Sequence, residues 1–304
     1  MDYAKRYGEY VALVEETIEG LLPQTQADCP DAAGVIPKHL CESMRYSLLA
    51  GGKRVRPVLL LAACDMLGGD MEQAKVPAAA LEMIHTYSLI HDDLPGMDDD
   101  DYRRGRLTNH KVYGVGHAIL AGDALLNYAY ECMLQNALAH GENMKGLVRA
   151  ASAIAGRAGV CGMIAGQSLD LLSEHIAPDA DRLLYIHSHK TADLLTAPLV
   201  AAGHIAGAGE AEMKALADFG ACVGLAFQID DDLLDVLGDA QELGKQTGMD
   251  EQRGKMTWPS LVGVAKAQER SAQLWDGALA CLAPFGERAW FLRAFAEGLR
   301  SRKK

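Results

Sequence analysis

The chain has little basic charge and no long apolar run. Of its 304 residues, 29 are Lys or Arg and 41 are Asp or Glu, so its formal net charge is −12. Surfaces that bind nucleic acid or anionic membranes usually need a basic field, so this balance argues against both. The longest uncharged run, Leu194 to Gly209, falls short of the roughly 18 apolar residues of a spanning helix, and Pro198 and His204 interrupt it. We expect a soluble protein without a membrane span.

Cysteine motifs are also missing, and we expect no leader sequence. The seven cysteines are scattered, odd in number and never spaced as CxxC. That pattern is typical of a reduced compartment and provides neither a zinc site nor a disulfide framework. The first 22 residues are amphipathic and acidic, unlike a signal peptide. We therefore expect a cytoplasmic protein.

The alternating pattern of a β-strand is nearly absent, and apolar residues recur instead at spacings of three and four. No Ser/Gly-rich linker or low-complexity tract divides the chain. This predicts one all-α domain, residues 1–304, of roughly ten or more helices around one core. The helical pattern is clearest over Ala4–Leu22, Glu72–His91, Ala118–Leu138, Leu147–Leu172, Arg182–Ala206 and Glu210–Leu237.

A first acidic motif follows one of these helical stretches. Residues 91–105 read HDDLPGMDDDDYRRG, and Pro95 and Gly96 should end the helix just beyond Asp92 and Asp93. Carboxylates at a helix C-terminus meet the negative end of its dipole, so bound cations would stabilise them. Oxygen ligands favour Mg²⁺, Mn²⁺ or Ca²⁺. Taken alone, this motif is more typical of a solvated, charge-balanced loop.

A second acidic motif, FQIDDDLLD, lies at residues 227–235 inside an apolar helical stretch. Gln228, Asp231 and Asp235 should share one helix face, where like charges repel unless a cation lies between them. An acidic surface stripe is the alternative. If the two motifs face each other across a helical bundle, they form a clamp for several cations.

Cationic side chains accompany both motifs. The segment GGKRVRP precedes an apolar helix, and Lys53 and Arg56 beside a helix N-terminus suit a diphosphate. His85 lies two helical turns before Asp92 on the same face. His187 and His189 should point apart on a helix and make a poor metal pair. Further groups that could contact phosphate, each more typical of a surface when taken alone, are Arg103, Arg104, Lys190 with Thr191, Lys245 and Lys255.

With these motifs in this order, the sequence resembles the trans-isoprenyl diphosphate synthases, most of all the bacterial farnesyl diphosphate synthases, or geranyltranstransferases. The resemblance implies an all-α fold, a single large helical bundle around a deep central cavity, and a homodimer. It implies Mg²⁺-dependent condensation of isopentenyl diphosphate with dimethylallyl or geranyl diphosphate to give farnesyl diphosphate. The matching stretches are GGKRVRP (51–57), IHTYSLIHDDLPGMDDDDYRRGRLTNH (84–110), GQSLDL (166–171), HKT (189–191), FQIDDDLLDVLGD (227–239), GK (244–245) and GKMTWP (254–259).

The resemblance also implies roles for residues. Several Mg²⁺ ions, three of them with substrate bound, would be held by Asp92, Asp98, Asp231 and Asp235, with Asp93 and Asp232 in support. These six aspartates and Lys190 form the implied catalytic set. The allylic diphosphate would be held by Arg103, Lys190 and Lys245, with Thr191 and Gln228 beside it, and isopentenyl diphosphate by Lys53, Arg56, His85 and Arg104; Lys255 is a further substrate contact.

A residue other than the metal and diphosphate contacts is the candidate that sets the product length. Tyr87 lies five residues before Asp92, roughly 7–8 Å down the helix axis from the metal end. With Ser88 beside it, the ring could form the floor that stops the growing chain at C15. Two questions stay open: Asp230 either joins the cation site or faces solvent, and the basic tail, Arg300 to Lys304, either closes over isopentenyl diphosphate or is solvated.

Four other functions compete with this interpretation. A geranylgeranyl (C20) diphosphate synthase would share the motifs. A terpene cyclase would not need GGKRVRP or a matching second DDxxD. An HD-type phosphohydrolase could use His91 and Asp92 but would need upstream histidines. A noncatalytic subunit of a prenyl synthase typically loses aspartates that this chain retains.

Overall fold

The structure is a computed structural model that describes residues 2–23, 36–173, 176–177, 179–237 and 255–302. In these residues helices dominate, and β1 (Tyr102–Arg103) and β2 (Arg106–Leu107) form a single short hairpin. The prediction of an all-α fold is confirmed. The chain divides into two compact units, residues 1–61 with 70–151 (unit 1) and residues 62–69 with 152–304 (unit 2). A single domain around a central cavity therefore stays a prediction.

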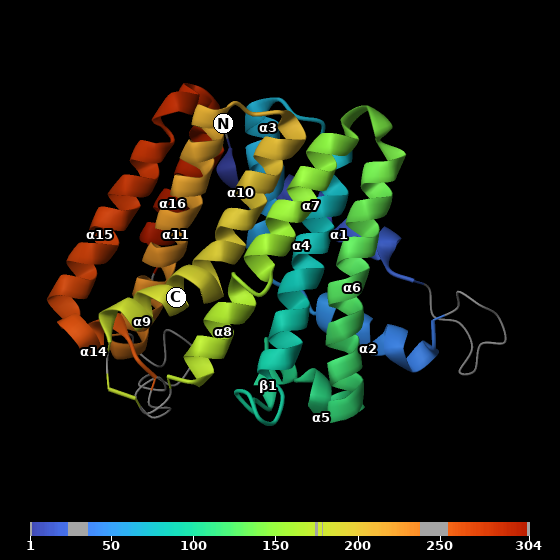
Figure 1. The fold of residues 1–304 in the computed structure, drawn as a ribbon, viewed down its shortest axis with the longest axis horizontal. Coiled ribbons are helices and arrows are strands. Elements are labelled where there is room, and N and C mark those ends of the chain that lie inside the picture. The colour runs from blue at the N-terminus through green and yellow to red at the C-terminus, as the bar shows by residue number, and fades with distance from the viewer. Residues whose placement is uncertain (1, 24–35, 174–175, 178, 238–254, 303–304) are drawn as a thin grey trace. The chain divides into compact units, whose positions relative to one another are not determined.

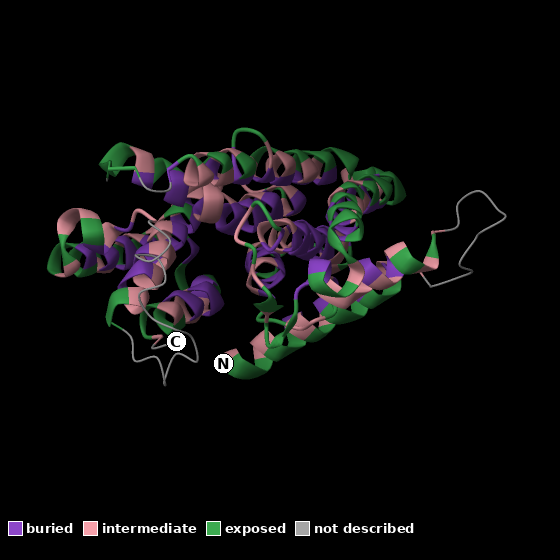
Figure 2. Cartoon of the chain, turned by 90° about the horizontal axis from the view of Figure 1, so that it is seen from below, coloured by how far each residue is buried: buried purple, intermediate pink, exposed green. Residues whose placement is uncertain are grey.

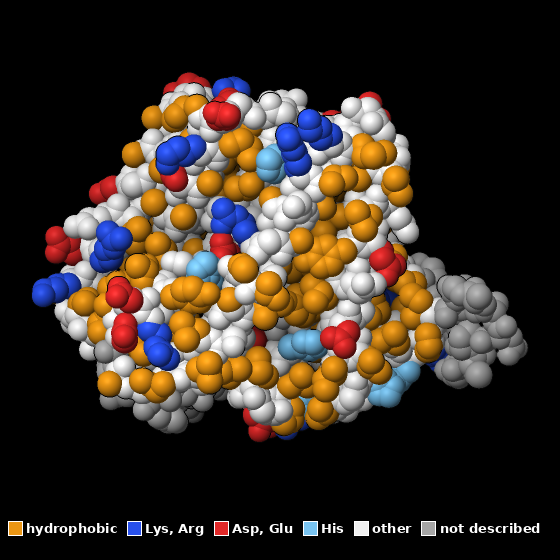
Figure 3. All heavy atoms as spheres, viewed as in Figure 1, with side chains coloured by type: hydrophobic (Ala, Val, Ile, Leu, Met, Phe, Trp, Pro, Cys, Tyr) orange, Lys and Arg blue, Asp and Glu red, His pale blue; other side chains and the backbone are white. Residues whose placement is uncertain are grey.

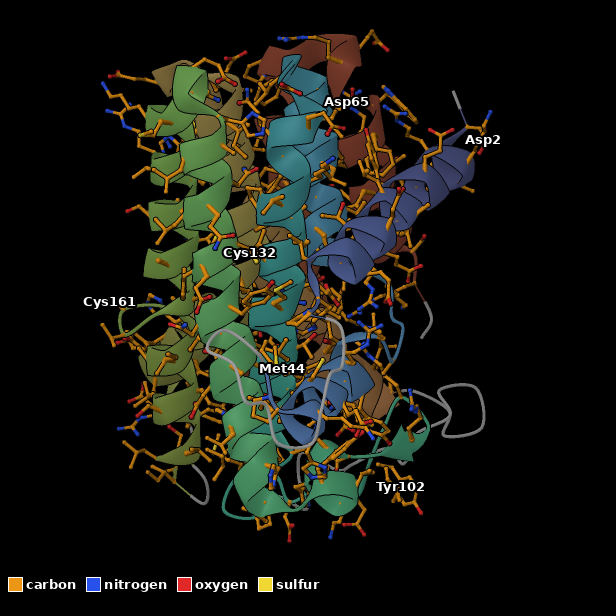
Figure 4. The ribbon with its side chains drawn as sticks, turned by 90° about the vertical axis from the view of Figure 1, so that its right-hand side faces the viewer. Asp2, Met44, Asp65, Tyr102, Cys132 and Cys161 are labelled. Carbon is orange, nitrogen blue, oxygen red and sulfur yellow. The ribbon has the colours of Figure 1, made fainter. Side chains whose placement is uncertain are left out.

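Unit 1 is built on α4 (Met71–Asp92) and α6 (Val115–Ala139), which pack along each other and run side by side in Figures 1 and 4. On α1 the buried residues Tyr10, Val14 and Ile18 recur every fourth position, as an amphipathic helix requires. Met44 and Cys132, labelled in Figure 4, belong to the same buried core, which is purple in Figure 2. The other elements are α1 (Tyr3–Leu21), α2 (Lys38–Leu48), α5 (Asn109–Tyr113), η1 (Gly141–Asn143), and parts of α3 (Val55–Leu67) and α7 (Met144–Ala158).

Helix α4 carries the first acidic motif, and its course has identifiable causes. Asp70 caps its start by accepting a hydrogen bond from Glu72 N at 2.9 Å. Pro77 lies inside the helix and cannot donate to the carbonyl of Gln73. Asn136 of α6 supplies that hydrogen bond instead, at 3.0 Å, so the proline is accommodated by the neighbouring helix.

The hairpin after the first motif was not expected from the sequence. Tyr102 pairs with Leu107 and Arg103 with Arg106, and the two residues between them, Arg104 and Gly105, have φ of 52° and 74°. Positive φ at both central positions is the mark of a type I′ turn. Tyr102, labelled in Figure 4, is exposed and points away from the helices.

Unit 2 is built on α11 (Glu210–Leu237), which packs against α10 and α15 and carries the second acidic motif. Its bounds agree with the predicted stretch. The predicted stretch Leu147–Leu172 is broken, however, because a turn at residues 159–162 separates α7 from α8. The elements are α8 (Met163–Leu171), α9 (Ala180–Ile186), η2 (His187–Ala192), α10 (Asp193–Ala206), α14 (Trp258–Val262), α15 (Val264–Cys281), η3 (Ala283–Ala289) and α16 (Trp290–Arg300), with the remainders of α3 and α7.

Between α9 and α10 the helix widens into one π-helical segment, η2, that contains His189, Lys190 and Thr191. Such segments often mark functional sites. Two glycines allow it to lie close to its neighbours. A Cβ at Gly166 of α8 would come within 2.7 Å of Lys190 Cα, and a Cβ at Gly224 of α11 would collide with Ala192. The η2 backbone thus occupies space that is available only because residues 166 and 224 have no side chain.

One stretch, Gly141–Leu171, has the length and apolar composition of a membrane span, with a mean hydropathy of 1.3 in its best window, of which 33% is buried. It is not one continuous helix. α7 has 15 residues and α8 has nine, and each is shorter than the about 20 residues that span a bilayer. Ile164 on α8 and Leu172, its C-cap, are exposed, and Figure 3 shows hydrophobic atoms over this helix.

Candidate active site

The first motif begins where α4 ends. Asp92 is the last helical residue and Asp93 its C-cap, as Pro95 and Gly96 predicted. The chain then turns back, so that Asp98 N donates a hydrogen bond to the carbonyl oxygen of Asp92 at 2.8 Å. Both residues are half-buried. The turn therefore brings the two candidate ligands of this motif together at the negative end of the α4 dipole.

Asp93 serves to fix the hairpin. Its carboxylate is 3% exposed and accepts hydrogen bonds from Arg103 Nε at 2.8 and 2.9 Å, with Arg103 Nη2 at 2.6 Å. Burial raises the pKa of Asp93, and the bond to Arg103 acts against that rise. A buried carboxylate with a bidentate guanidinium is rigid, so Asp93 holds Arg103 in place, and its supporting role at the metal site stays a prediction.

A cationic pocket lies at the start of α3, and it contains all four residues expected to hold isopentenyl diphosphate. Gly52 lines it with no side chain, and a Cβ there would come within 2.8 Å of the Arg104 guanidinium carbon. The pocket is lined by Ala50, Gly52, Lys53, Arg54, Val55, Arg56, Glu82, His85 and Arg104.

The electrostatics of this pocket favour an anion. Burial lowers the pKa of Arg56 to about 10, with Glu82 raising it and Arg104 lowering it further. The Nε of Arg56 is buried without a hydrogen-bond partner. Burial and four neighbouring arginines hold the pKa of His85 well below its usual value, so His85 is a neutral donor at physiological pH. Converging cations with an unsatisfied donor are the arrangement that a diphosphate would complete.

Nothing in the sequence singled out Arg54 and Glu82, which organise the pocket. Glu82 is 1% exposed, and Arg54 Nη1 donates to it at 2.8 Å. Arg54 Nη2 also donates to Leu48 O at 3.0 Å, and the residue has φ of 50°. A non-glycine residue at positive φ is strained, and such strain concentrates at functional sites. The only available signal was a carboxylate within the apolar run of α4.

Tyr87 is buried on α4 and packs edge-on against His91, with ring centroids 5.7 Å apart. Burial raises the pKa of its phenol to about 12, with contributions from Tyr130 and Asp92. The Ser88 hydroxyl donates to His85 O at 2.9 Å. The ring is thus a rigid neutral group close to the Asp92 end of α4, and its role in product length stays a prediction.

In unit 2 a second pocket collects five of the predicted residues. The Thr191 hydroxyl donates to Gln228 Oε1 at 2.8 Å, and Lys190 pairs with Asp170. Asp170 and His187 were not predicted to belong here, although Asp170 lies in the GQSLDL stretch. Lys245 lies outside the described residues. The pocket is lined by Asp170, Ile186, His187, Lys190, Thr191, Gln228, Asp232, Lys255, Met256 and Thr257.

The consecutive aspartates of the second motif have different partners. Asp230 accepts hydrogen bonds from Trp275 Nε1 at 2.8 Å and from the Ser271 hydroxyl, both on α15. It therefore faces α15, which is neither of the two surroundings that the sequence left open. Asp232 is 2% exposed and lines the pocket.

Asp231 and Asp235 are half-buried on α11. The guanidinium of Arg302 pairs with Asp231, donates to Phe227 O at 3.1 Å, and lies over the Phe227 ring at 4.0 Å. The described part of the basic tail thus reaches the second motif.

The histidines of η2 have separate partners, in agreement with the sequence prediction. His187 contacts Trp258, whereas His189 pairs with Asp193 at 2.7 Å. In the described residues of the chain, no group of three or more His, Cys, Asp or Glu side chains is arranged to hold a metal. A metal clamp would need both acidic motifs, which lie in different units.

Comparison with known proteins identifies the class. The sequence profile of the polyprenyl synthetase family matches residues 37–280, and the chain belongs to this family. It is 44% identical over 295 residues to a dimethylallyltranstransferase from Fischerella ambigua, covering 97% of this chain and 83% of that one. It is 49% identical over 243 residues to geranylgeranyl pyrophosphate synthase 11 of Arabidopsis thaliana, covering 78% and 67%.

Solved structures of similar fold belong to the same class of enzyme. An FPP/GFPP synthase from Zymomonas mobilis superposes with a TM-score of 0.83 at 32% identity and covers 98% of this chain and 99% of its own. A geranyltransferase from Legionella pneumophila gives 0.84 at 30% identity, covering 99% and 97%. The protein is a transferase of the short-chain trans-isoprenyl diphosphate synthase family.

Proposed function

We propose that the protein joins isopentenyl diphosphate to dimethylallyl and then geranyl diphosphate, and so forms farnesyl diphosphate with Mg²⁺ as its cofactor. The observation that carries this proposal most directly is the pocket of unit 1. Lys53, Arg56, His85 and Arg104 converge there, and a buried Arg56 Nε lacks a partner. That arrangement suits the diphosphate of isopentenyl diphosphate.

The allylic diphosphate is assigned to the pocket of unit 2. Lys190, Thr191 and Lys255 offer donors there, and Gln228 orients Thr191. When the allylic carbon–oxygen bond breaks, charge develops on the departing diphosphate, and fixed donors stabilise that charge. Lys245 and Arg103 are assigned to the same substrate by family resemblance. Arg103 keeps further N–H groups for it beyond those on Asp93.

The donor set fits Mg²⁺. Asp92 and Asp98, held together by a backbone hydrogen bond, and Asp231 and Asp235, one of which already receives a guanidinium, offer carboxylate oxygens that hard cations prefer. Held by either pair of carboxylates, Mg²⁺ would neutralise the charge of the leaving diphosphate. The double bond of isopentenyl diphosphate then forms the new carbon–carbon bond, and the released diphosphate accepts the proton that leaves.

The C15 product is the finer part of the proposal. The bulky, buried Tyr87 near the Asp92 end of α4 supports a short product. A C20 product is the second candidate, because several relatives of 48–49% identity are named geranylgeranyl pyrophosphate synthases. A homodimer in the cytoplasm is also proposed, by resemblance to the family. Retention of both acidic motifs argues against a noncatalytic subunit.

The test is incubation of the purified protein with radiolabelled isopentenyl diphosphate and each allylic diphosphate, with and without Mg²⁺. We expect Mg²⁺-dependent condensation and a principal C15 product by chromatography. A principal C20 product would replace the C15 assignment with the second candidate. Absence of any Mg²⁺-dependent condensation would refute the proposed function.

A further inference from the structure

Asp232 is the most deeply buried aspartate of the second motif, and both of its carboxylate oxygens have hydrogen-bond donors. Trp258 N donates to Asp232 Oδ2 at 2.9 Å, and Gln228 Nε2 lies 3.3 Å from Oδ1. His187 Nε2 is 3.7 Å from Oδ2. A buried carboxylate is stable only with such donors, so their placement determines where Asp232 points.

Trp258 uses both of its N–H groups in this arrangement. It is the first residue of α14, where a backbone N–H has no partner within the helix. That group binds Asp232, while the indole Nε1–H donates to His187 Nδ1 at 3.1 Å. Thr257 and Ser260 form a capping box that fixes the start of α14. The tryptophan therefore connects α14 to η2 and to α11.

His187 is suited to accept that hydrogen bond. It is 5% exposed, and burial lowers its pKa to about 4, with Asp170 raising it and Lys190 lowering it. The neutral ring accepts at Nδ1, which places its proton on Nε2, toward Asp232. His187 also opens the π-helical segment that contains Lys190 and Thr191.

We infer that His187 and Trp258 are positioning residues, which fix Asp232 and, through Gln228, the Thr191 hydroxyl on the wall of the diphosphate pocket. The inference rests on the proposed function. Hydrogen bonds run without a break from Thr191 to Gln228 to Asp232, and from Trp258 to both Asp232 and His187. Three segments distant in sequence thereby share one network on one pocket.

Trp258→Phe removes the indole donor and keeps the backbone N–H. His187→Leu removes the acceptor, and His187→Gln retains one. The matched control is Trp275→Phe, which removes an indole donor to Asp230, outside the pocket. The measurements are KM for each substrate, the Kd of inorganic pyrophosphate with Mg²⁺ by calorimetry, and the melting temperature.

We expect Trp258→Phe and His187→Leu to raise the KM for the allylic diphosphate and the Kd for pyrophosphate about tenfold, the factor that 1.4 kcal/mol represents. The KM for isopentenyl diphosphate should stay within about twofold, and His187→Gln should restore most of the loss. Trp275→Phe should lower the melting temperature and change neither constant.

Unchanged allylic KM and pyrophosphate Kd in both variants, or equal effects in Trp275→Phe, would overturn the inference. If Trp258→Phe does not fold, the pair His187→Leu and His187→Gln decides it in the same way. If the native protein shows no condensation, the proposed function fails. The pyrophosphate contrast between Trp258→Phe and Trp275→Phe still decides the positioning role.

Discussion

Replacing Asp230 with asparagine should destabilise the protein and spare its activity, whereas replacing the adjacent Asp231 should change the stability less and lower the activity strongly. The structure provides the reason. Asp230 accepts hydrogen bonds from Trp275 and Ser271 of α15, away from the pocket, whereas Asp231 meets the guanidinium of Arg302. Consecutive residues of one helix point about 100° apart, so neighbouring aspartates serve different surroundings.

The magnitude follows from the bonds lost. Hydrogen bonds to a charged group contribute about 1.5–3 kcal/mol each, and the introduced amide keeps one acceptor oxygen while turning its NH₂ toward a donor. We expect Asp230→Asn to lose about 2 kcal/mol. With an unfolding entropy of about 2.1 cal/mol/K per residue, a loss of that size lowers the melting temperature of this chain by about 3 °C. Asp231→Asn loses a partly exposed ion pair of at most about 1 kcal/mol.

Activity should rank the two variants in the opposite order. Asp231→Asn removes half of a metal-binding pair in the proposed mechanism, so kcat/KM should fall by at least about 100-fold, or roughly 2.7 kcal/mol of transition-state stabilisation. Asp230→Asn should stay within about twofold of the native rate at about 25 °C. The assays are differential scanning fluorimetry and radiolabelled condensation. Equal losses of activity in the two variants, with no change in melting temperature for Asp230→Asn, would refute this reasoning.

Three further predictions address other parts of the site. Tyr87→Ala should lengthen the product beyond C15, measured by chromatography of the hydrolysed products, and unchanged C15 output would remove Tyr87 from the floor. Arg302→Gln should lower the Kd for Mg²⁺ about threefold, measured by calorimetry, because it removes a competing cation from Asp231. The control Arg300→Gln breaks a surface ion pair with Asp276 and should leave the Kd for Mg²⁺ unchanged. Burial lowers the pKa of His187 to about 4, so the free energy of unfolding should be highest above about pH 6.5 and should fall by roughly 3 kcal/mol as the pH falls toward 4. Urea unfolding at several pH values measures this dependence. His187→Gln should lack this part of the pH dependence, and the same dependence in both proteins would contradict the assignment.

Local signals in the sequence were sufficient for much of the fold. Pro95 and Gly96 fixed the end of α4 at Asp92, and the periodicity of residues 210–237 predicted the bounds of α11. The turn at residues 159–162 was missed because its apolar flanks continue a helical pattern on both sides. The hairpin at Arg104 was missed because arginine rarely adopts positive φ, so the residue provides no turn signal.

The site was predictable where the motifs resemble those of a known family. Lys53, Arg56, His85 and Arg104 were named from the sequence, and the structure places them around one pocket. The partners that orient them were not predictable. In the sequence Glu82 is a single polar residue in an apolar helix. Its role is visible only in the structure, where Arg54 from another segment donates a hydrogen bond to it.

The two glycines beside η2 change how a mutational scan of this protein should be interpreted. Neither Gly166 nor Gly224 carries a functional group, yet a methyl group at either would displace the backbone of Lys190 or Ala192. Alanine at these positions should therefore resemble loss of Lys190 in activity screens. Sensitivity at such positions would report the space that the η2 segment needs, and a scan that equates sensitivity with chemistry would count two residues too many in the catalytic set.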